Sequence, residues 1–313
     1  MIFEAFSFFS SWLAWHLVNM EIADMESLIS FFEDIPTTYR SGILIGGIFI
    51  FWVMEGLVPL FQFQYNKYRH AGINLLFTLF TAIIGFGLAG ALYYTSYWVT
   101  INEFGLLNIA EIPLWAKVVL GVMLLDFVGA YLVHWIEHKV TWMWKFHLIH
   151  HTDTTVDVTT GLRHHPGETV FRILFTILGV FLIGVPIGIV MLYQSLSVLF
   201  AHITHANINM PRKVDNAISY LFVTPNMHKV HHHYTQPLTD TNYGNIFAVW
   251  DRVFGTYAYV ENPKELKYGI DTHMDPEEND RFSNLLKIPF QKYRPPIGSK
   301  FNNKSERSDE DKS

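Results

Sequence analysis

Residues 72–99 read GINLLFTLFTAIIGFGLAGALYYTSYWV and contain no Asp, Glu, Lys or Arg. A helix needs about 20 apolar residues to cross a bilayer, so this stretch is long enough to span one. Apolar runs of similar length occupy 42–61, interrupted by Glu55, and 114–136. Only 16% of the 313 residues are charged, against about 25% in soluble domains. The pattern predicts an all-α, polytopic membrane helical bundle; the alternative is a set of buried helices in a large soluble protein.

A fourth run, 173–201, carries no formal charge and is broken by Gly184, Pro186 and Gly188. As one helix it would be roughly 43 Å long, beyond a hydrocarbon core of about 30 Å. We expect a re-entrant hairpin that turns at these residues, because proline and glycine break the helical ladder; the alternative is one steeply tilted helix. Each arm would have about 12–15 residues, which excludes two complete crossings. Residues 2–20 are rich in Phe and Trp and fit either a further span or an interfacial helix.

Basic residues in the loops predict the orientation. Lys67 and Arg69 lie in a loop without acids between the first two predicted spans, so this loop should be cytoplasmic. Segments 20–41 and 100–113 are acidic and fit the opposite side. The basic segment 137–172 then returns to the cytoplasm, which predicts a polar cytoplasmic cap beyond the last span.

Composition excludes several classes of function. The chain has no cysteine, so disulfides, thiolate catalysis and iron–sulfur clusters held by cysteine are not expected. A net charge of −6 argues against nucleic acid as a partner, because phosphate binding needs a basic surface. Sixteen histidines remain as candidate metal ligands.

Most of these histidines occur in motifs with short spacings. The motifs are His134-x-x-x-His138, His147-x-x-His150-His151, His164-His165, His202-x-x-His205 and His228-x-x-His231-His232. Residues three or four apart share one face of a helix, so HxxxH should present two imidazoles to one point and HxxHH three. The two HxxHH motifs, the HxxxH motif and the HxxH motif together give ten inward-facing imidazoles, enough for two metal ions, and imidazole suits iron, copper, zinc and nickel alike. The alternative is that these histidines are solvated surface residues.

Other histidines and one acid need separate interpretation. His16, His70 and His273 have no histidine partner at these spacings and are expected to be structural or exposed. His165 begins an HPGE stretch similar to a haem-ligating HPGG, but it lies between metal motifs and a membrane run, so haem is not expected. Asp126 lies within a predicted span two turns before His134. We expect it either to orient a ligand imidazole or to bond a neighbouring helix.

The motifs occur in a recognisable order. They are HWIEH at 134–138, WKFHLIHHTDTTVDVTTGLRHHPGE at 144–168, HANI at 205–208, TPNMHKVHHHY at 224–234 and DTNYGNIFAVWDRVFGTY at 240–257. Over 126–257 the chain resembles the fatty acid hydroxylase / sterol desaturase superfamily. The resemblance implies that the metal ligands are His134, His138, His147, His150, His151, His228, His231 and His232. It also matches His205, and His165 within RHHP; His164 occupies a position that is often aromatic, and His202 one that varies.

The resemblance implies a di-iron centre with two iron ions per chain and no haem, which uses O₂ to hydroxylate a C–H bond of a fatty acyl or sterol-like lipid. No electron-transfer segment is present, so a separate NAD(P)H-dependent electron-transfer chain is the expected partner. A desaturase with the same centre is the main alternative. A metal transporter and a zinc-dependent membrane hydrolase are further ones, although catalytic zinc usually takes three protein ligands.

The expected organisation has four parts: an N-terminal transmembrane region at 1–125, a catalytic domain at 126–260 that includes the hairpin at 173–201, a cytoplasmic extension at 261–294 and a disordered tail at 295–313.

Overall fold

The computed structural model describes residues 23–298. Within that range the regular secondary structure consists of helices, with no strand. Five helical segments are long and apolar enough to cross a membrane: Thr37–Leu57, Lys67–Asn108, Leu114–Lys139, Pro166–Ile183 and Ile187–His205. The described residues are therefore all-helical and form a multi-pass membrane protein. The expectation for residues 2–20 and most of the predicted tail lie outside the described residues.

The first two spans are α3 (Thr37–Leu57) and α4 (Lys67–Ile101). The side chain of Asn66 caps α4 by accepting a hydrogen bond from the backbone N–H of Arg69, which satisfies one of the free donors of the first turn. Much of the α4 surface is exposed and apolar; Phe86, for example, is 87% exposed. Such a surface is stable in contact with lipid and unstable in water.

The third span contains a local irregularity just before the first histidine motif. Helix α5 (Leu114–Asp126) passes into a π-helical turn, η2 (Phe127–Leu132), and then into α6 (Val133–Lys139). A π turn inserts an extra residue into the helical ladder and is frequent at functional sites. Here it fixes the direction in which α6 points His134 and His138. Helix α7 (Thr141–His151) follows after a bend at Val140.

Helices α8 (Pro166–Ile183) and α9 (Ile187–His205) form the hairpin. Gly184 has φ +79, a left-handed conformation that suits glycine. Its carbonyl oxygen accepts a hydrogen bond from Asn108 Nδ2 at 3.0 Å, and Ser96 Oγ donates to Val185 O at 2.9 Å. The turn therefore lies beside the far end of α4, near the short helix η1 (Leu106–Asn108).

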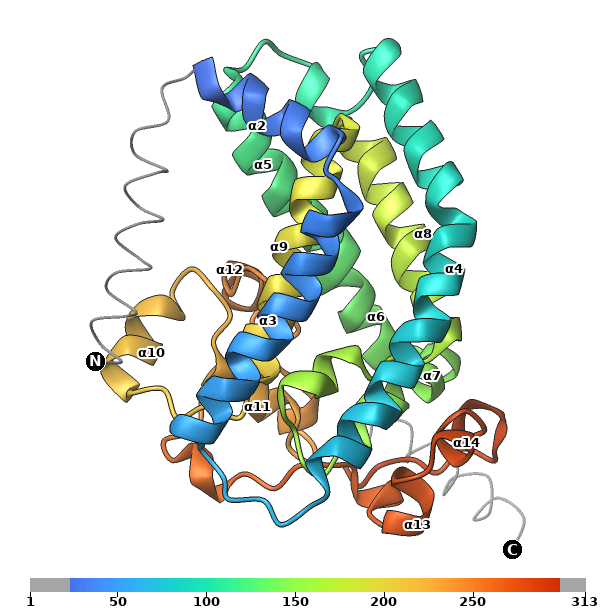
Figure 1. Cartoon of the computed structure of the whole chain (residues 1–313), viewed down its shortest axis with the longest axis vertical. Helices are drawn as coiled ribbons and strands as arrows, with labels where there is room; N and C mark the ends of the chain where they lie inside the picture. The colour runs from blue at the N-terminus through green and yellow to red at the C-terminus, as the bar shows by residue number, and fades with distance from the viewer. Residues whose placement is uncertain (1–22, 299–313) are drawn as a thin grey trace, which may run out of the picture.

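The arms are longer than the sequence indicated. They have 18 and 19 residues, or about 27–29 Å, so the expectation of 12–15 residues was wrong. The apolar run 173–201 lies between Arg172 and His202. The helices continue past these polar residues, to Pro166 on one arm and to His205 on the other. Length no longer excludes two complete crossings. Either way, the two outer ends of the hairpin lie at the same end of the bundle (Figure 1).

Short helices and loops cover that end of the bundle and extend along one side of it (Figure 1). They are α10 (Arg212–Ile218), α11 (Pro225–His231), η4 (Leu238–Asp240), α12 (Val249–Val253), η5 (Pro263–Glu265), η6 (Asp271–His273), α13 (Pro276–Asn279), α14 (Phe282–Leu285) and η7 (Ile288–Phe290), together with η3 (Val158–Leu162) after α7. A cluster that includes Phe77, Trp144, Ile149, Ile270 and Leu285 packs this cap against α4 and α7. Helix α2 (Ala23–Glu33) packs on α9 at the other end, where Ile29 lies against Gly188.

Candidate metal centre

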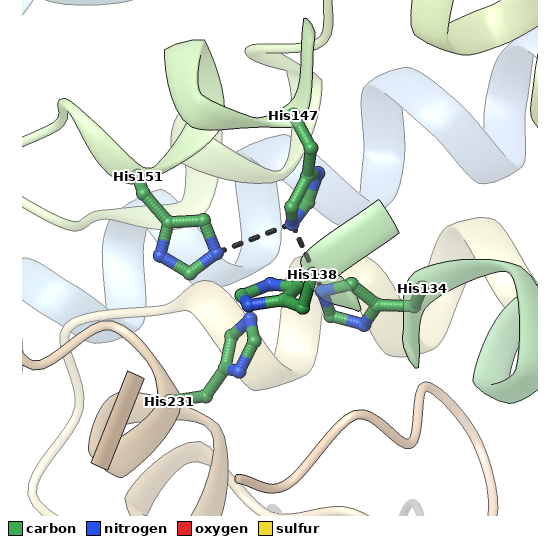
Figure 2. A group of neighbouring side chains, drawn as sticks. All are labelled: His134, His138, His147, His151 and His231. Atoms are coloured by element: carbon green, nitrogen blue, oxygen red, sulfur yellow. Dashed lines mark hydrogen bonds between the residues drawn. The ribbon is translucent and has the colours of Figure 1, made fainter. Parts of the chain in front are cut away.

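The histidine motifs converge into two buried groups at the covered end of the bundle. The first histidine group is His134, His138, His147, His151 and His231, and the second is His150, His205, His228 and His232. Within each group the nitrogen atoms that face one another all lie within 4.8 Å. Figure 2 shows the five rings of the first group turned toward a common centre. Both groups draw residues from α7 and α11, so the two centres share one pair of helices.

Each HxxHH motif is divided between the groups. His147 and His151 belong to the first group, whereas His150 belongs to the second; in α11, His228 and His232 belong to the second and His231 to the first. The expectation that one motif directs three imidazoles to one point was wrong. Residues i and i+4 lie about 40° apart around a helix, whereas i+3 and i+4 differ by about 100°. The outer pair therefore faces one centre and the middle histidine faces the other.

In four histidines of the first group, the Nδ1 atom contacts an oxygen atom of the protein. His134 Nδ1 donates to Tyr243 O at 2.9 Å, and His231 Nδ1 donates to Thr241 O at 2.7 Å. His138 Nδ1 lies 3.1 Å from Asp240 Oδ1. His147 Nδ1 lies 2.9 Å from Glu168 Oε1. Such contacts fix the tautomer and the ring orientation of metal-binding histidines.

This arrangement leaves nitrogen lone pairs facing one another. A backbone carbonyl only accepts and an ionised carboxylate only accepts, so His134 and His147 carry their protons on Nδ1. Their Nε2 atoms lie 2.9 Å apart, and both then present a lone pair. The buried Nε2 atoms of His138 and His231 have no hydrogen-bond partner among the described residues. A shared cation would satisfy all four atoms at once, so the donor set fits a metal ion.

The second group has the same character. His205 Nδ1 donates to Ala201 O at 2.7 Å, while its Nε2 lies 3.1 Å from His150 Nε2 and 2.9 Å from His228 Nε2. His232 Nε2 lies 3.2 Å from His228 Nε2. Four nitrogen atoms again converge without a carboxylate between them.

Burial keeps these imidazoles neutral, which is the form that binds metal. Burial lowers the pKa of His147 to about 3, although the negative charge of Glu168 opposes the shift. Burial and the neighbouring imidazoles also lower the pKa of His151 and His231 well below the usual value. His228 and His232 shift in the same direction for the same reasons.

A buried ion-pair network supports the first group, and the sequence analysis missed it. Arg172 donates to Glu168 Oε1 and to Glu137 Oε2, both at 2.8 Å. Glu168 Oε1 also lies 2.8 Å from His164 Nδ1. A signal was present: His164, Glu168 and Arg172 follow one another at intervals of four, and residues at this spacing share a helix face.

Three further histidines, His164, His165 and His202, lie outside the two groups. The ring of His164 stacks on that of His150 with centroids 4.5 Å apart, so it lies beside the second group. His165 lies outside both groups; its Nδ1 caps α8 by accepting from Gly167 N at 2.9 Å. His202 is also outside both groups, packed against Gly47 of α3.

Asp126 is fully buried but bonds backbone groups. Its carboxylate accepts from Ile246 N at 3.2 Å and from Phe247 N at 3.1 Å. These residues follow Tyr243, whose carbonyl oxygen holds His134. Asp126 therefore positions the loop that carries Tyr243 and does not contact the imidazole of His134 itself.

A cavity of about 880 Å³ opens onto both groups. His134, His147, His150, His205 and His228 contribute to its wall, together with residues of α3, α4, α8 and α9. Its volume is within the range of sites that hold small organic ligands. The two groups and the cavity form one continuous site.

Comparisons with known proteins agree with this site. Residues 118–256 match the model of the fatty acid hydroxylase family. The chain is 28% identical over 158 residues to an ornithine lipid hydroxylase of Rhizobium tropici, covering 50% of this chain and 46% of that protein. It is 29% identical over 162 residues to the alkylglycerol monooxygenase of Homo sapiens (51% and 33%). It is 25% identical over 229 residues to a methylsterol monooxygenase of Arabidopsis thaliana (71% and 84%).

The match to the first two of these relatives spans about half of their length or less. No solved structure matches the chain. The family match covers every residue of the two histidine groups. The match of residues 118–256 to this family confirms the resemblance drawn from the histidine motifs.

Proposed function

We propose that this protein is a membrane-bound, non-haem di-iron oxygenase that hydroxylates a C–H bond of a lipid with O₂ and externally supplied electrons. The observation that carries the proposal is the pair of buried all-histidine groups on one cavity. The names of the three relatives given above, which are hydroxylases or monooxygenases, favour hydroxylation over desaturation. A separate NAD(P)H-dependent chain is the proposed electron donor.

Nine histidines would hold the two iron ions: His134, His138, His147, His151 and His231 one of them, and His150, His205, His228 and His232 the other. Bound iron would supply the activation of O₂ and the oxidation of the C–H bond. His164 stands beside the second ion, while His165 and His202 serve as a helix cap and a packing residue in this proposal.

The number of histidines supports iron over zinc. One group offers five imidazoles and the other four, whereas catalytic zinc usually takes three protein ligands and a water molecule. The zinc-dependent hydrolase is therefore the weaker alternative.

The residues around the site would orient the ligands and exclude water. Glu168, Asp240 and the carbonyl oxygens of Thr241 and Tyr243 fix the ring orientations. Lys139 bonds Asp240 at 2.6 Å and balances its charge. The cap closes the centre on the polar side, and we place that side in the cytoplasm because the basic residues Lys67 and Arg69 lie at that end, in the first turn of α4.

Metal analysis with an oxidation assay tests the proposal. The purified protein should contain about two irons per chain and consume O₂ when reductant and a lipid extract are supplied, with a gain of 16 mass units on a lipid. Removal of iron with a chelator should abolish both, and iron but not zinc should restore them. Full activity of an iron-free protein would refute the assignment.

Glu168→Gln is expected to weaken iron binding or turnover by about 10–100-fold, the usual effect of losing a carboxylate that orients a metal-bound histidine. The amide keeps the size of the side chain but removes the charge that faces His147 and Arg172. Competition with a chelator measures the affinity, and thermal melting of the iron-free protein separates it from a loss of stability.

Glu278→Gln is the matched control, because Glu278 pairs with Arg294 and both side chains are about 40% exposed. This surface pair should contribute little. Unchanged iron affinity and turnover in Glu168→Gln would contradict the proposed role of Glu168.

A further inference from the structure

The cavity extends from the histidines along α9 toward the other end of the bundle. Its wall on this helix runs from His205 back to Met191, a rise of about 21 Å. Ile43 and Leu44 of α3 and Val198 of α9 line the section between. The section of the cavity lined by Ile43, Leu44 and Val198 is therefore suited to a hydrocarbon chain.

Polar side chains gather farther from the histidines. Thr37, Arg40, Ser41 and Gln194 line the cavity. Within residues 23–298 none of these side chains has a hydrogen-bond or ion-pair partner. By contrast, the hydroxyl of Ser197 already accepts from Asn245 at 2.8 Å. The four free side chains are available to a ligand.

The position of these polar residues along the helices can be derived from one contact. A Cβ atom on Gly47 of α3 would lie 2.7 Å from the ring of His202 on α9. The two helices run in the same direction (Figure 1). Arg40 is seven residues before Gly47, and Gln194 is eight before His202. Both therefore lie about 10–12 Å from this contact, toward the N-terminal ends of the two helices. His205 lies one turn below it, which separates the polar residues from the second histidine group by about 15 Å.

Arg40 differs from the second arginine in the cavity wall. Arg172 is bonded to Glu137 and Glu168, so its charge is already balanced. Arg40 is exposed at the mouth of the cavity and has no acidic partner among the described residues. An unpaired guanidinium in a cavity wall is suited to a carboxylate or a phosphate, which it can bind with two parallel hydrogen bonds.

The cavity also reaches the lipid-facing surface. Phe86 of α4 lines it and is 87% exposed, and Ile43 and Leu44 of α3 line the same cavity. A lipid could therefore enter between α3 and α4 without crossing the polar cap.

We propose that the cavity binds a lipid with an anionic headgroup, which Arg40 holds through its phosphate or carboxylate while the hydrocarbon chain extends along α9 to the histidines. This inference rests on the proposed oxidation at the histidine groups. A fully extended alkyl chain advances about 1.25 Å per carbon, so about a dozen carbons span the 15 Å between Arg40 and the second group. Gln194 and Ser41 complete the headgroup site.

Equilibrium binding of paired lipids to the iron-loaded protein in a non-ionic detergent tests the inference. Palmitate is compared with methyl palmitate, and phosphatidate with the diacylglycerol of the same chains. At least one anionic lipid should bind about tenfold more tightly than its neutral partner, and the pair that shows the difference identifies the group. Arg40→Gln should remove the difference by weakening the anionic lipid alone.

Two further variants locate the effect in the cavity. Lys117→Gln removes a cation at the same end of the bundle, but Lys117 bonds Asn108 and is not part of the cavity wall, so the preference should persist. Val198→Trp fills the hydrocarbon section and should abolish saturable binding of both members of a pair.

The outcomes separate this inference from the proposed function. Equal binding of charged and neutral lipids by the unmodified protein would overturn the headgroup assignment. So would a preference that survives Arg40→Gln, or one that survives Val198→Trp and therefore belongs to the outer surface. Because binding is measured without turnover, a protein that shows the preference but oxidises no lipid would contradict the proposed function alone.

Discussion

Replacing His231 with Ala is expected to leave a protein that contains about one iron per chain and has no oxidation activity. The first histidine group loses one of five imidazoles, and the Nε2 lone pairs of His134 and His147 lose part of their metal site. The second group shares no residue with the first, so its ion should remain. Oxidation requires both ions in the proposed centre, and activity should therefore fall to background.

The reciprocal variant examines the second group. His228→Ala removes the residue whose Nε2 lies near those of both His205 and His232, and it should leave the iron of the first group in place. Iron per chain, measured by elemental analysis, is compared with activity and with the amount of protein in the membrane fraction.

His273→Ala is the matched control for these substitutions. His273 is buried, only 3% exposed, and lies outside both groups, so its loss tests what removal of any buried imidazole does. Two irons and normal turnover in His231→Ala would contradict the assignment of the first group. Loss of iron in His273→Ala would show that the effect comes from folding.

The sequence was sufficient to predict the nine histidines that converge, but it also named His165 and His202, which lie outside both groups, and it did not predict how the nine divide between the groups. The short spacings of the histidine motifs identified all nine residues of the two groups, because a helix brings positions three and four apart to neighbouring places. The same geometry could have assigned His147 with His151 and left His150 to the other centre. The spacing rule was applied to the whole motif, whereas the 100° between adjacent residues divides it.

Other features depend on contacts that the sequence does not display. Glu168 reaches His147 across 21 residues, and Asp240 reaches His138 across 102. Asp126 was noticed as an acid within a span, but only the folded chain shows that it bonds the backbone at Ile246 and Phe247. The hairpin turn was predicted at the correct residues, whereas its arms were too short, because a polar residue near a helix end does not end the helix.

Impermeant thiol reagents are expected to label cysteines at Gln64 and Lys264 from the same side of the membrane and a cysteine at Glu111 only from the other. All three residues are exposed. Gln64 lies between α3 and α4 at the covered end, Lys264 lies in the cap, and Glu111 lies in the loop after α4 at the opposite end. In intact cells only the Glu111 variant should react; permeabilisation should expose the other two. Because the natural chain has no cysteine, the unmodified protein gives a blank control.

The physical reason is the position of the hairpin between the ligands. His134, His138, His147, His150 and His151 precede it, and His228, His231 and His232 follow it. A shared centre can form only if both ends of the α8–α9 hairpin emerge on one side, whether the hairpin crosses fully or turns within the bilayer. An odd number of membrane crossings between His151 and His228 would place about 30 Å of hydrocarbon between the two sets of ligands. Labelling of Lys264 together with Glu111, and apart from Gln64, would therefore break the hairpin arrangement and the shared metal centre with it.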